Sequence, residues 1–302
     1  MDQVIIDAPS SVTTSYLVAT HFHVGHPQLL IIPRLRELLA DEHPLAETAL
    51  ELLRSDSCTL TQLEVASSGR REDLQDVLGE QPALRAIQAA RYHQVLTVEA
   101  AVAALPKVAQ AMRLIARTLA FVTGGVFVDL AGRIVLADRH PALEPSAFTV
   151  SACWVTIVIN HGHDPDSLSA QTWGLSRFGL PELGTSGFGQ PSTLTAFNLL
   201  AGISTHLLDG QWAYLASRGT GPTRALPSRL DLDVAWVYRF YDLPPATAGT
   251  LPLQLRPVSS TPADGLHVLP AGGTDADLAR WWRTQVSAVI PDLHPKSGRN
   301  LR

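Results

Sequence analysis

Two clusters of histidines have residue types and spacing that fit metal chemistry. The first places three histidines within six residues, and the second joins two histidines to two aspartates just after an apolar run. The members are His21, His23 and His26 in the first cluster, and His161, His163, Asp164 and Asp166 in the second. Imidazole and carboxylate groups suit zinc or manganese. A metal-dependent hydrolase that uses His21, His23, His161 and His163 is therefore one hypothesis for the function.

The first cluster is similar to the His-x-His-x-Asp-His signature of the metallo-β-lactamases, in which these residues hold two zinc ions. Gly25 stands where that signature has aspartate, and only 20 residues precede the motif. We expect His21 and His23 to share one face of a strand, about 6.5 Å apart. A catalytic metal site also needs second partners for its imidazoles. The sequence therefore predicts no tightly bound metal at this cluster.

The second cluster has a simpler interpretation as a turn, because asparagine, glycine, aspartate and proline in such a loop are what a sharp turn requires. We interpret His161, His163 and Asp164 as candidate binding residues and not as metal ligands. Arg177 and Glu182 follow in the next segment and are further candidates. They either pair with each other or bind a partner.

Neither of two possible nucleophiles fits a catalytic pattern. Ser186 lacks the Gly-x-Ser-x-Gly elbow and a strand before it. Cys153 lies in a strongly apolar context, which does not favour an activated thiolate. The sequence therefore predicts no catalytic residue and no cofactor.

The candidate binding residues of the second cluster follow directly after the apolar run 153–159. Apolar residues occupy both alternating faces of this run, which predicts a central strand buried on both sides. The turn-rich residues 160–166 follow, and then a segment broken by glycine and proline up to residue 182. We expect the rest of the chain to cover this strand.

The first half of the chain alternates strands with helices. Residues 12–24 form a half-buried strand by their alternation, and residues 29–40 a helix with Pro33 in its first turn. The apolar stripe of residues 105–122 predicts a core-facing helix capped by Gly124. The remaining expected elements are a short helix ending near 53, strands at 60–65 and 92–98, and a tight hairpin of 126–130 with 133–137.

The second half contains a strong helix at 190–208, which Gly210 is expected to end. The sequence predicts a loop at residues 218–227 and a long strand at residues 232–240. Residues 251–255 are expected to form an edge strand, because prolines discourage further pairing. Thr274 is expected to cap a last helix at 275–290.

This element order predicts an α+β fold with mixed or antiparallel sheets covered by helices. With 302 residues, the chain is long enough for two lobes. We expect an N-terminal lobe at 1–138 and a C-terminal lobe at 139–302, with one continuous domain as the alternative.

Composition and charge exclude several classes of partner. The net charge is −5, so no electrostatic footprint for nucleic acid or for an anionic membrane is present. No apolar run is long enough for a membrane-spanning helix, and the first residues lack the features of a signal peptide. We therefore expect a cytoplasmic protein, with Cys58 and Cys153 as buried thiols outside any disulfide.

The segment 171–182 carries a resemblance to a known family. Its residues Thr172, Gly174, Leu175, Phe178, Gly179, Pro181 and Glu182 match a Thr-x-Gly-[Leu/Met]-x-x-Phe-Gly-x-x-Glu-like pattern. In this the chain resembles the bacterial family named "domain of unknown function 4261". The run 184–189 is small and polar where that family continues in an acidic and apolar strand. The resemblance implies an α+β fold and brings no established activity and no catalytic residues.

The sequence favours a module that binds a protein or another ligand, without catalysis. A protein partner is one expectation, including the neutralisation of a toxin. Self-association is another, with the 232–240 strand or the helix that carries Trp281 and Trp282 at the interface. No nucleic-acid partner, membrane partner or cofactor is expected.

Overall fold

The computed structural model describes residues 3–70, 72–136, 140–150, 153–162, 167–217, 221–259 and 265–294. The chain forms two compact units. Ser11–Phe148 makes up the N-terminal unit, and Thr149–Arg302 together with Met1–Ser10 makes up the C-terminal unit. The expected boundary was at 138/139, with the first residues in the N-terminal lobe. Helices and mostly antiparallel sheets occur in both units, which confirms the α+β class.

The N-terminal unit is built on an antiparallel sheet with the strand order β3-β4-β2-β5-β6 among the described residues. The central strand β2 pairs with β4 on one side and with β5 on the other. The hairpin expected after the long helix is confirmed as β5 and β6. The strands are β2 (Ser11–Thr20), β3 (Cys58–Glu64), β4 (Tyr92–Ala101), β5 (Val126–Asp129) and β6 (Ile134–Val135).

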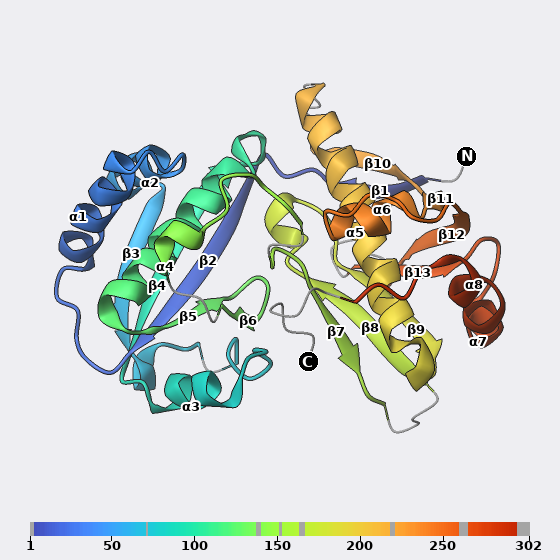
Figure 1. Ribbon diagram of the computed structural model, residues 1–302, viewed down its shortest axis with the longest axis horizontal. Coiled ribbons are helices and arrows are strands. Elements are labelled where there is room, and N and C mark those ends of the chain that lie inside the picture. The colour runs from blue at the N-terminus through green and yellow to red at the C-terminus, as the bar shows by residue number, and fades with distance from the viewer. Residues whose placement is uncertain are drawn as a thin grey trace. The chain divides into compact units, whose positions relative to one another are not determined.

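Helices cover both faces of this sheet. The helices are α1 (Pro27–Ala40), α2 (Ala46–Arg54), α3 (Gln81–Ala89) and α4 (Lys107–Thr123). Helix α4 packs on β2, β4 and β5, with α1 and α2 against it, and α3 packs on β2 and β5 (Figure 1). The core-facing stripe of α4 is confirmed by Leu119, which is fully buried. Gly124 ends the helix with a φ of 63°, the left-handed geometry expected of a C-terminal cap.

Three expectations for this unit were wrong. Strand β2 ends at Thr20, so His21 and His23 lie in the exposed segment that follows and not on a strand face. The strand is not half-buried either, because Leu17 and Ala19 pack in a second apolar cluster on the α3 side. Helix α1 begins at Pro27, which places Pro33 inside the helix and beyond its first turn.

A buried ion cluster joins α4 to the segment after the hairpin. Arg113 donates from Nε and Nη2 to the Glu144 carboxylate at 2.7–3.0 Å. Arg117 Nε lies 3.3 Å from Glu144 Oε2, and the side chains of all three residues are at most 8% exposed. Both arginines lie outside the apolar stripe of residues 105–122. Because a buried charge is costly unless it is paired, the cluster must form for α4 to pack here.

The C-terminal unit contains a mixed sheet with the strand order β11-β12-β13-β9-β8-β7 among the described residues. Among the described strand pairs of this sheet, only β13–β9 is parallel. Its strands are β7 (Thr156–Asn160), β8 (Leu168–Trp173), β9 (Leu183–Phe188), β11 (Arg229–Asp233), β12 (Thr250–Pro257) and β13 (Leu266–Pro270). A separate antiparallel pair joins β1 (Gln3–Asp7) to β10 (Thr223–Pro227), so the chain's first strand belongs to this unit.

Helix α5 (Thr193–Ala216) is the main helix of this unit and packs on β7, β8 and β9 (Figure 1). Helix α6 (Ala235–Phe240) packs beside it. A final helical segment includes α7 (Leu278–Trp281) and α8 (Ser287–Val289), and α7 packs on β9 and β13. Its expected cap is confirmed, because the Thr274 amide donates to Asp277 Oδ2 at 2.9 Å.

The apolar run 153–159 is not a central strand. Strand β7 begins only at Thr156 and lies at the edge of the described sheet, while Cys153 precedes it with a φ of 60°. Strand β8 lies in the segment expected to be broken by glycine and proline, and it pairs antiparallel with β9, which follows that segment. The positions closer to the middle of the sheet are therefore filled by strands that the sequence did not predict.

Four further expectations failed in this unit. The 232–240 strand is the end of β11 followed by α6, where Asp233 Oδ1 accepts the Ala235 amide at 2.8 Å and favours a helix start. Strand β12 lies between β11 and β13 and is not an edge strand. Helix α5 continues through Gly210 to Ala216, and the expected loop 218–227 contains β10.

Candidate functional site

The predicted binding residues lie in different surroundings. His161 is exposed directly after β7, and His163 and Asp164 lie outside the described residues, as does Asp166. The positions of Arg177 and Glu182 are described, and both side chains take part in the local structure.

Glu182 organises the turn between β8 and β9. Its carboxylate accepts a hydrogen bond from Thr172 Oγ1 at 2.8 Å, from the Gly174 amide at 2.9 Å and from the Ser176 amide at 3.0 Å. Three donors on one carboxylate satisfy backbone groups that the turn leaves without strand partners. The position of Glu182 in the resemblance pattern thus has a structural explanation.

Arg177 lies within the same turn and is 1% exposed. Its guanidinium lies 5.5 Å from the centre of the Trp154 ring, and Nε donates to the Gly174 carbonyl at 3.3 Å. Gly179 follows with a φ of 71°, a left-handed geometry that favours glycine at this break. Arg177 is too buried to present its charge to a partner.

The first histidine cluster is exposed. His21, His23 and His26 all lie in the segment between β2 and α1, and the His23 ring packs edge-on against Tyr92 at 5.6 Å. Within the described ranges, no group of three or more His, Cys, Asp or Glu side chains is placed to hold a metal ion.

The two cysteines are thiols and not a disulfide, as the sequence predicted, although both are only half-buried. Burial raises the pKa of Cys58 to about 11, so its thiol stays protonated at neutral pH. Cys58 therefore does not supply a thiolate nucleophile.

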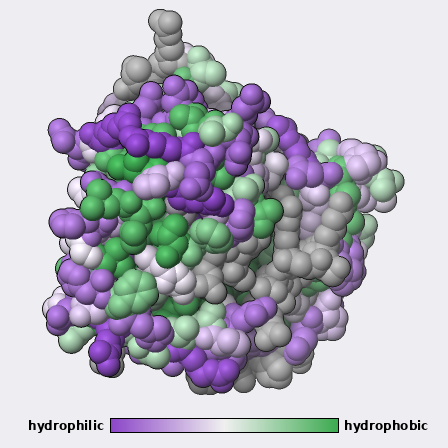
Figure 2. Space-filling model, turned by 60° about the vertical axis from the view of Figure 1, so that its left-hand side comes forward, coloured by the Kyte–Doolittle hydropathy of each residue, from purple (hydrophilic) through white to green (hydrophobic). Residues whose placement is uncertain are grey.

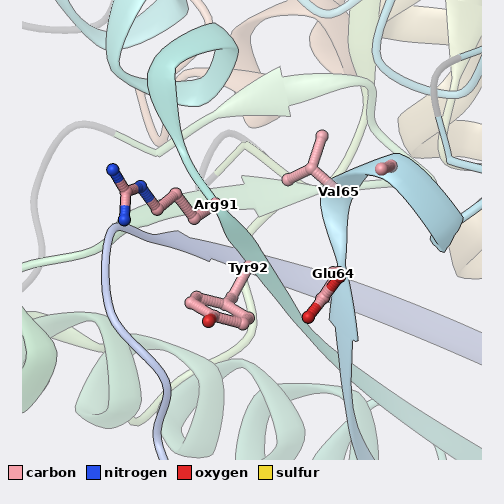
Figure 3. A pocket seen from close by; sticks show the side chains of 5 residues that line it. Glu64, Val65, Arg91 and Tyr92 are labelled. Carbon is pink, nitrogen blue, oxygen red and sulfur yellow. The ribbon is translucent and has the colours of Figure 1, made fainter.

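An open hollow of about 460 Å³ lies where β3 ends and β4 begins. Its lining includes Glu64, Val65, Arg91 and Tyr92, and Figure 3 shows Glu64 and Tyr92 pointing to one side of the sheet. Tyr92 is also the ring that His23 contacts, so the hollow adjoins the histidine segment. Glu64 and Arg91 bring opposite charges to the same opening.

A different group of polar residues lies on one face of the C-terminal unit's sheet. By strand register, His267 on β13 pairs with Arg256 on β12 and with Gly184 on β9, and Ser186 follows two residues after Gly184. Their buried neighbours along the strands, such as Leu183, Thr185 and Val268, point to the opposite face. The polar group is thus displayed away from the buried layer.

On this face an imidazole lies between a hydroxyl and a carboxylate. Ser186 Oγ is 3.3 Å from His267 Nε2, and His267 Nδ1 is 3.6 Å from Asp275 Oδ1. Arg256 Nη2 donates to both carboxylate oxygens of Asp275, at 2.8 and 2.9 Å. The order hydroxyl, imidazole, carboxylate is that of a serine nucleophile with its general base and the group that orients the base.

The electrostatics favour a neutral imidazole. Partial burial lowers the pKa of His267, Asp275 raises it and Arg256 lowers it again. With its pKa below the ordinary value of about 6.5, His267 is free to accept a proton at neutral pH.

Sequence reasoning set Ser186 aside and did not identify His267 or Asp275. These residues lie on three separate elements, and 81 positions separate the serine from the histidine. No short motif joins them. The local signal was the small and polar run 184–189, which was taken as a departure from strand character, although β9 contains most of it.

Comparison of the chain with known proteins gave no matching family model, no similar curated protein and no similar solved structure. Among the described residues, no helix combines the length and the apolar character needed to cross a membrane.

Proposed function

We propose that this chain is a protein-binding module that pairs with a second copy of itself through the N-terminal unit. The observation that carries the proposal is a set of exposed large apolar side chains, here called the apolar patch. It consists of Phe22, Leu29, Leu30, Phe121 and Val122, which are 52%, 68%, 43%, 41% and 37% exposed. Contiguous exposed apolar surface is typical of protein interaction sites.

The topology gathers these residues at one end of the unit. Val126, at the start of β5, pairs with Ala19 near the end of β2, so α4 ends beside the segment that leads into α1. Arg34 lies 5.3 Å over the Phe121 ring, and Leu30 is one helical turn before Arg34 on α1. Figure 2 presents this unit's side of the molecule and shows hydrophobic residues grouped among hydrophilic ones.

The charges near the patch suit a symmetric partner. Glu64 and Arg91 are exposed in the hollow next to the histidine segment, and neither forms an ion pair with another described residue. In a two-fold dimer each surface faces its own copy, so Arg91 of one chain can pair with Glu64 of the other. A surface that carries both signs is therefore self-complementary.

The surfaces that the sequence suggested for self-association are not available. Trp281 and Trp282 are 2% and 1% exposed, and Val237, Tyr238 and Phe240 of α6 are buried as well. We do not carry the metal-dependent hydrolase forward, since the described part of the chain brings no sufficient set of ligands together.

The test is the oligomeric state measured by sedimentation velocity over a range of concentrations. We expect a dimer that Leu30→Glu and Phe121→Glu convert to monomer, because each places a charge in an apolar interface. Leu39→Glu is the matched control, since Leu39 is 42% exposed at the other end of the same helix. A wild-type protein that stays monomeric, or equal effects at Leu30 and Leu39, would overturn the proposal.

A charge exchange tests self-complementarity itself. Arg91→Glu is expected to weaken the dimer by placing two acidic groups opposite each other. Adding Glu64→Arg in the same chain restores the pairing with reversed polarity. If the double variant is no better than the single one, the two residues do not meet across the interface.

A further inference from the structure

We propose that Ser186, His267 and Asp275 form a nucleophilic serine site that hydrolyses small, activated carboxylic esters. This activity goes beyond self-association and lies in the other unit, so neither proposal depends on the other. It rests on the order of atoms, since His267 presents Nε2 to the serine and Nδ1 to the aspartate. That order is the one in which an imidazole can take the serine proton while a carboxylate steadies its other nitrogen.

The two distances around His267 are longer than in an active complex, as is common for a catalytic site without substrate. The 3.3 Å between Ser186 Oγ and His267 Nε2 is a long hydrogen bond, and the 3.6 Å between His267 Nδ1 and Asp275 Oδ1 is outside hydrogen-bond range. Catalytic hydrogen bonds are often long without substrate and shorten in the complex. Asp275 is exposed, so its side chain is able to close this gap.

The backbone around Ser186 is held by specific contacts. The register of β8 and β9 shifts between Leu168 and Ser169, and Gly187 at this irregularity has a φ of 74°. A Cβ at Gly187 would lie only 3.0 Å from the Leu278 side chain of α7. Trp282 Nε1 donates to the Ser186 carbonyl at 2.9 Å. A bulge next to a reactive residue re-aims its side chain and is frequent at active sites.

Space for a substrate lies beside the imidazole. Gly184 pairs with His267 and precedes Ser186 by two residues on the same face. A Cβ built on Gly184 would meet only the Ala170 carbonyl oxygen, at 3.8 Å. Across from Ser186 stands another small residue, Ser169. These small neighbours leave room for a short acyl group above the serine hydroxyl.

Arg256 has a positioning role. Its two hydrogen bonds to Asp275 keep that carboxylate in the neighbourhood of His267, although Asp275 begins a separate helical segment. A fork that binds both oxygens sets the orientation of a carboxylate better than a single contact does. Arg256 thus acts through Asp275 and not on the substrate.

The chemistry proceeds in two balanced steps. Ser186 Oγ forms a bond to the ester carbonyl carbon, its proton passes to His267 Nε2, and the bond to the leaving oxygen breaks as that oxygen takes the proton. Water then attacks the acyl-serine, gives its proton to Nε2, and Ser186 leaves with that proton. The products are an alcohol and a carboxylic acid, and no oxidant, reductant or cofactor is consumed.

The exposure of the site at Ser186 and His267 limits the substrates that it can hydrolyse. An exposed site shields its substrate little from water, so the transition state gains little from a low local dielectric. Esters with good leaving groups, such as aryl esters of short acids, need the least stabilisation. We therefore expect p-nitrophenyl acetate to react and unactivated amides to remain intact.

The experiment uses the whole chain and a fluorophosphonate probe, which reacts with activated serines, and locates the label by peptide mass spectrometry. We expect a label on Ser186 that is lost in Ser186→Ala and slowed about 100-fold or more in His267→Gln. Ser217→Ala is the matched control, because it removes an exposed serine hydroxyl of the same unit, which donates to the Tyr214 carbonyl, and leaves the contact between Ser186 and His267 intact. Hydrolysis of p-nitrophenyl acetate should follow the same order.

Two outcomes would overturn the proposal. One is a wild-type protein without label on Ser186 under conditions that label a known serine hydrolase. The other is a Ser186 label that forms equally fast in His267→Gln, which would show an accessible serine without a general base. Thermal melting of each variant confirms that a lost label does not come from unfolding.

Discussion

The two units each hold a carboxylate bound by arginine, and the two clusters differ in burial. Glu144 is fully buried between Arg113 and Arg117, whereas Asp275 is 63% exposed and Arg256 is 43% exposed. In the first cluster water is excluded, so each charge depends on its partners. In the second, water screens the charges and either partner can be replaced at low cost.

The difference in burial indicates a structural role for the first cluster and a possible role in a reaction for the second. A buried cluster is costly to break and has no access to a substrate. An exposed one contributes little to the free energy of unfolding but can orient a neighbouring group, which is the role that we propose for Asp275 toward His267, 3.6 Å away. The chain therefore offers two pairings of the same residue types, one fitted to hold a helix and the other to support a reaction.

The largest effect is expected from Glu144→Gln. Removal of the carboxylate leaves two buried guanidinium groups without this counter-charge, which should lower the free energy of unfolding by about 3–5 kcal/mol. Chemical denaturation measures it. The matched control is Glu99→Gln, an exposed position in the same unit that should change stability by no more than about 0.5 kcal/mol. If Glu144→Gln lowers the free energy of unfolding as little as Glu99→Gln does, the buried cluster does not stabilise the fold as described.

Truncation of an apolar side chain in α4 gives a stability loss with which the loss in Glu144→Gln can be compared. Leu119 is fully buried on α4, so Leu119→Ala should cost about 2–5 kcal/mol through lost contacts and a cavity. The midpoint of denaturation should fall accordingly. A midpoint that hardly moves would mean that α4 does not face the core in solution.

Glu182 gives an intermediate case within the C-terminal unit. Its carboxylate accepts three hydrogen bonds, and a glutamine amide cannot keep all of them because its nitrogen is only a donor. Glu182→Gln should therefore lower the free energy of unfolding by about 1–3 kcal/mol. Wild-type stability in this variant would return Glu182 to the list of candidate binding residues.

The smallest effect is a shift in the pH dependence of Ser186 labelling. Labelling should rise as His267 loses its proton, with a midpoint below the ordinary value of about 6.5, since burial lowers this pKa. Asp275 raises the pKa and Arg256 lowers it, so Asp275→Asn should move the midpoint down and Arg256→Gln should move it up. Shifts in the same direction would show that the two charges do not act on His267 as described.

Periodic and well-capped elements could be predicted from the sequence. Helix α4 was found because its apolar stripe is long and Gly124 ends it, and the β5–β6 hairpin because its turn is short. The last helix was found from its cap at Thr274. In each of these the local pattern and the tertiary environment agree.

The failures share a physical cause, which is that burial was inferred from apolar character alone. Residues 232–240 alternate like a strand, yet the Asp233 carboxylate accepts the amide of Ala235, where α6 begins, and α6 packs against α5. Arg113 and Arg117 are polar in type but buried, because Glu144 reaches them from a distant segment. Strand β9 is small and polar, yet it pairs on both sides.

The candidate sites were the least predictable part. Arg177 and Glu182 stood out in the sequence because their turn has a recognisable pattern, and that turn is what they stabilise. Ser186, His267 and Asp275 come together only through the pairing of β9 with β13 and the start of the last helical segment. The resemblance to the "domain of unknown function 4261" family stays a prediction.

The central claim is that burial assigns one arginine–carboxylate cluster to stability and the other to reactivity. The most direct test measures both properties in Glu144→Gln and Asp275→Asn, using denaturation and Ser186 labelling under conditions where each variant remains folded. We expect each variant to lose one of the two properties and to keep the other. Glu144→Gln loses about 3–5 kcal/mol and keeps its labelling rate, whereas Asp275→Asn loses no more than about 1 kcal/mol and labels far more slowly. Variants that lose stability and labelling together, or an Asp275→Asn that labels like the wild type, would contradict it.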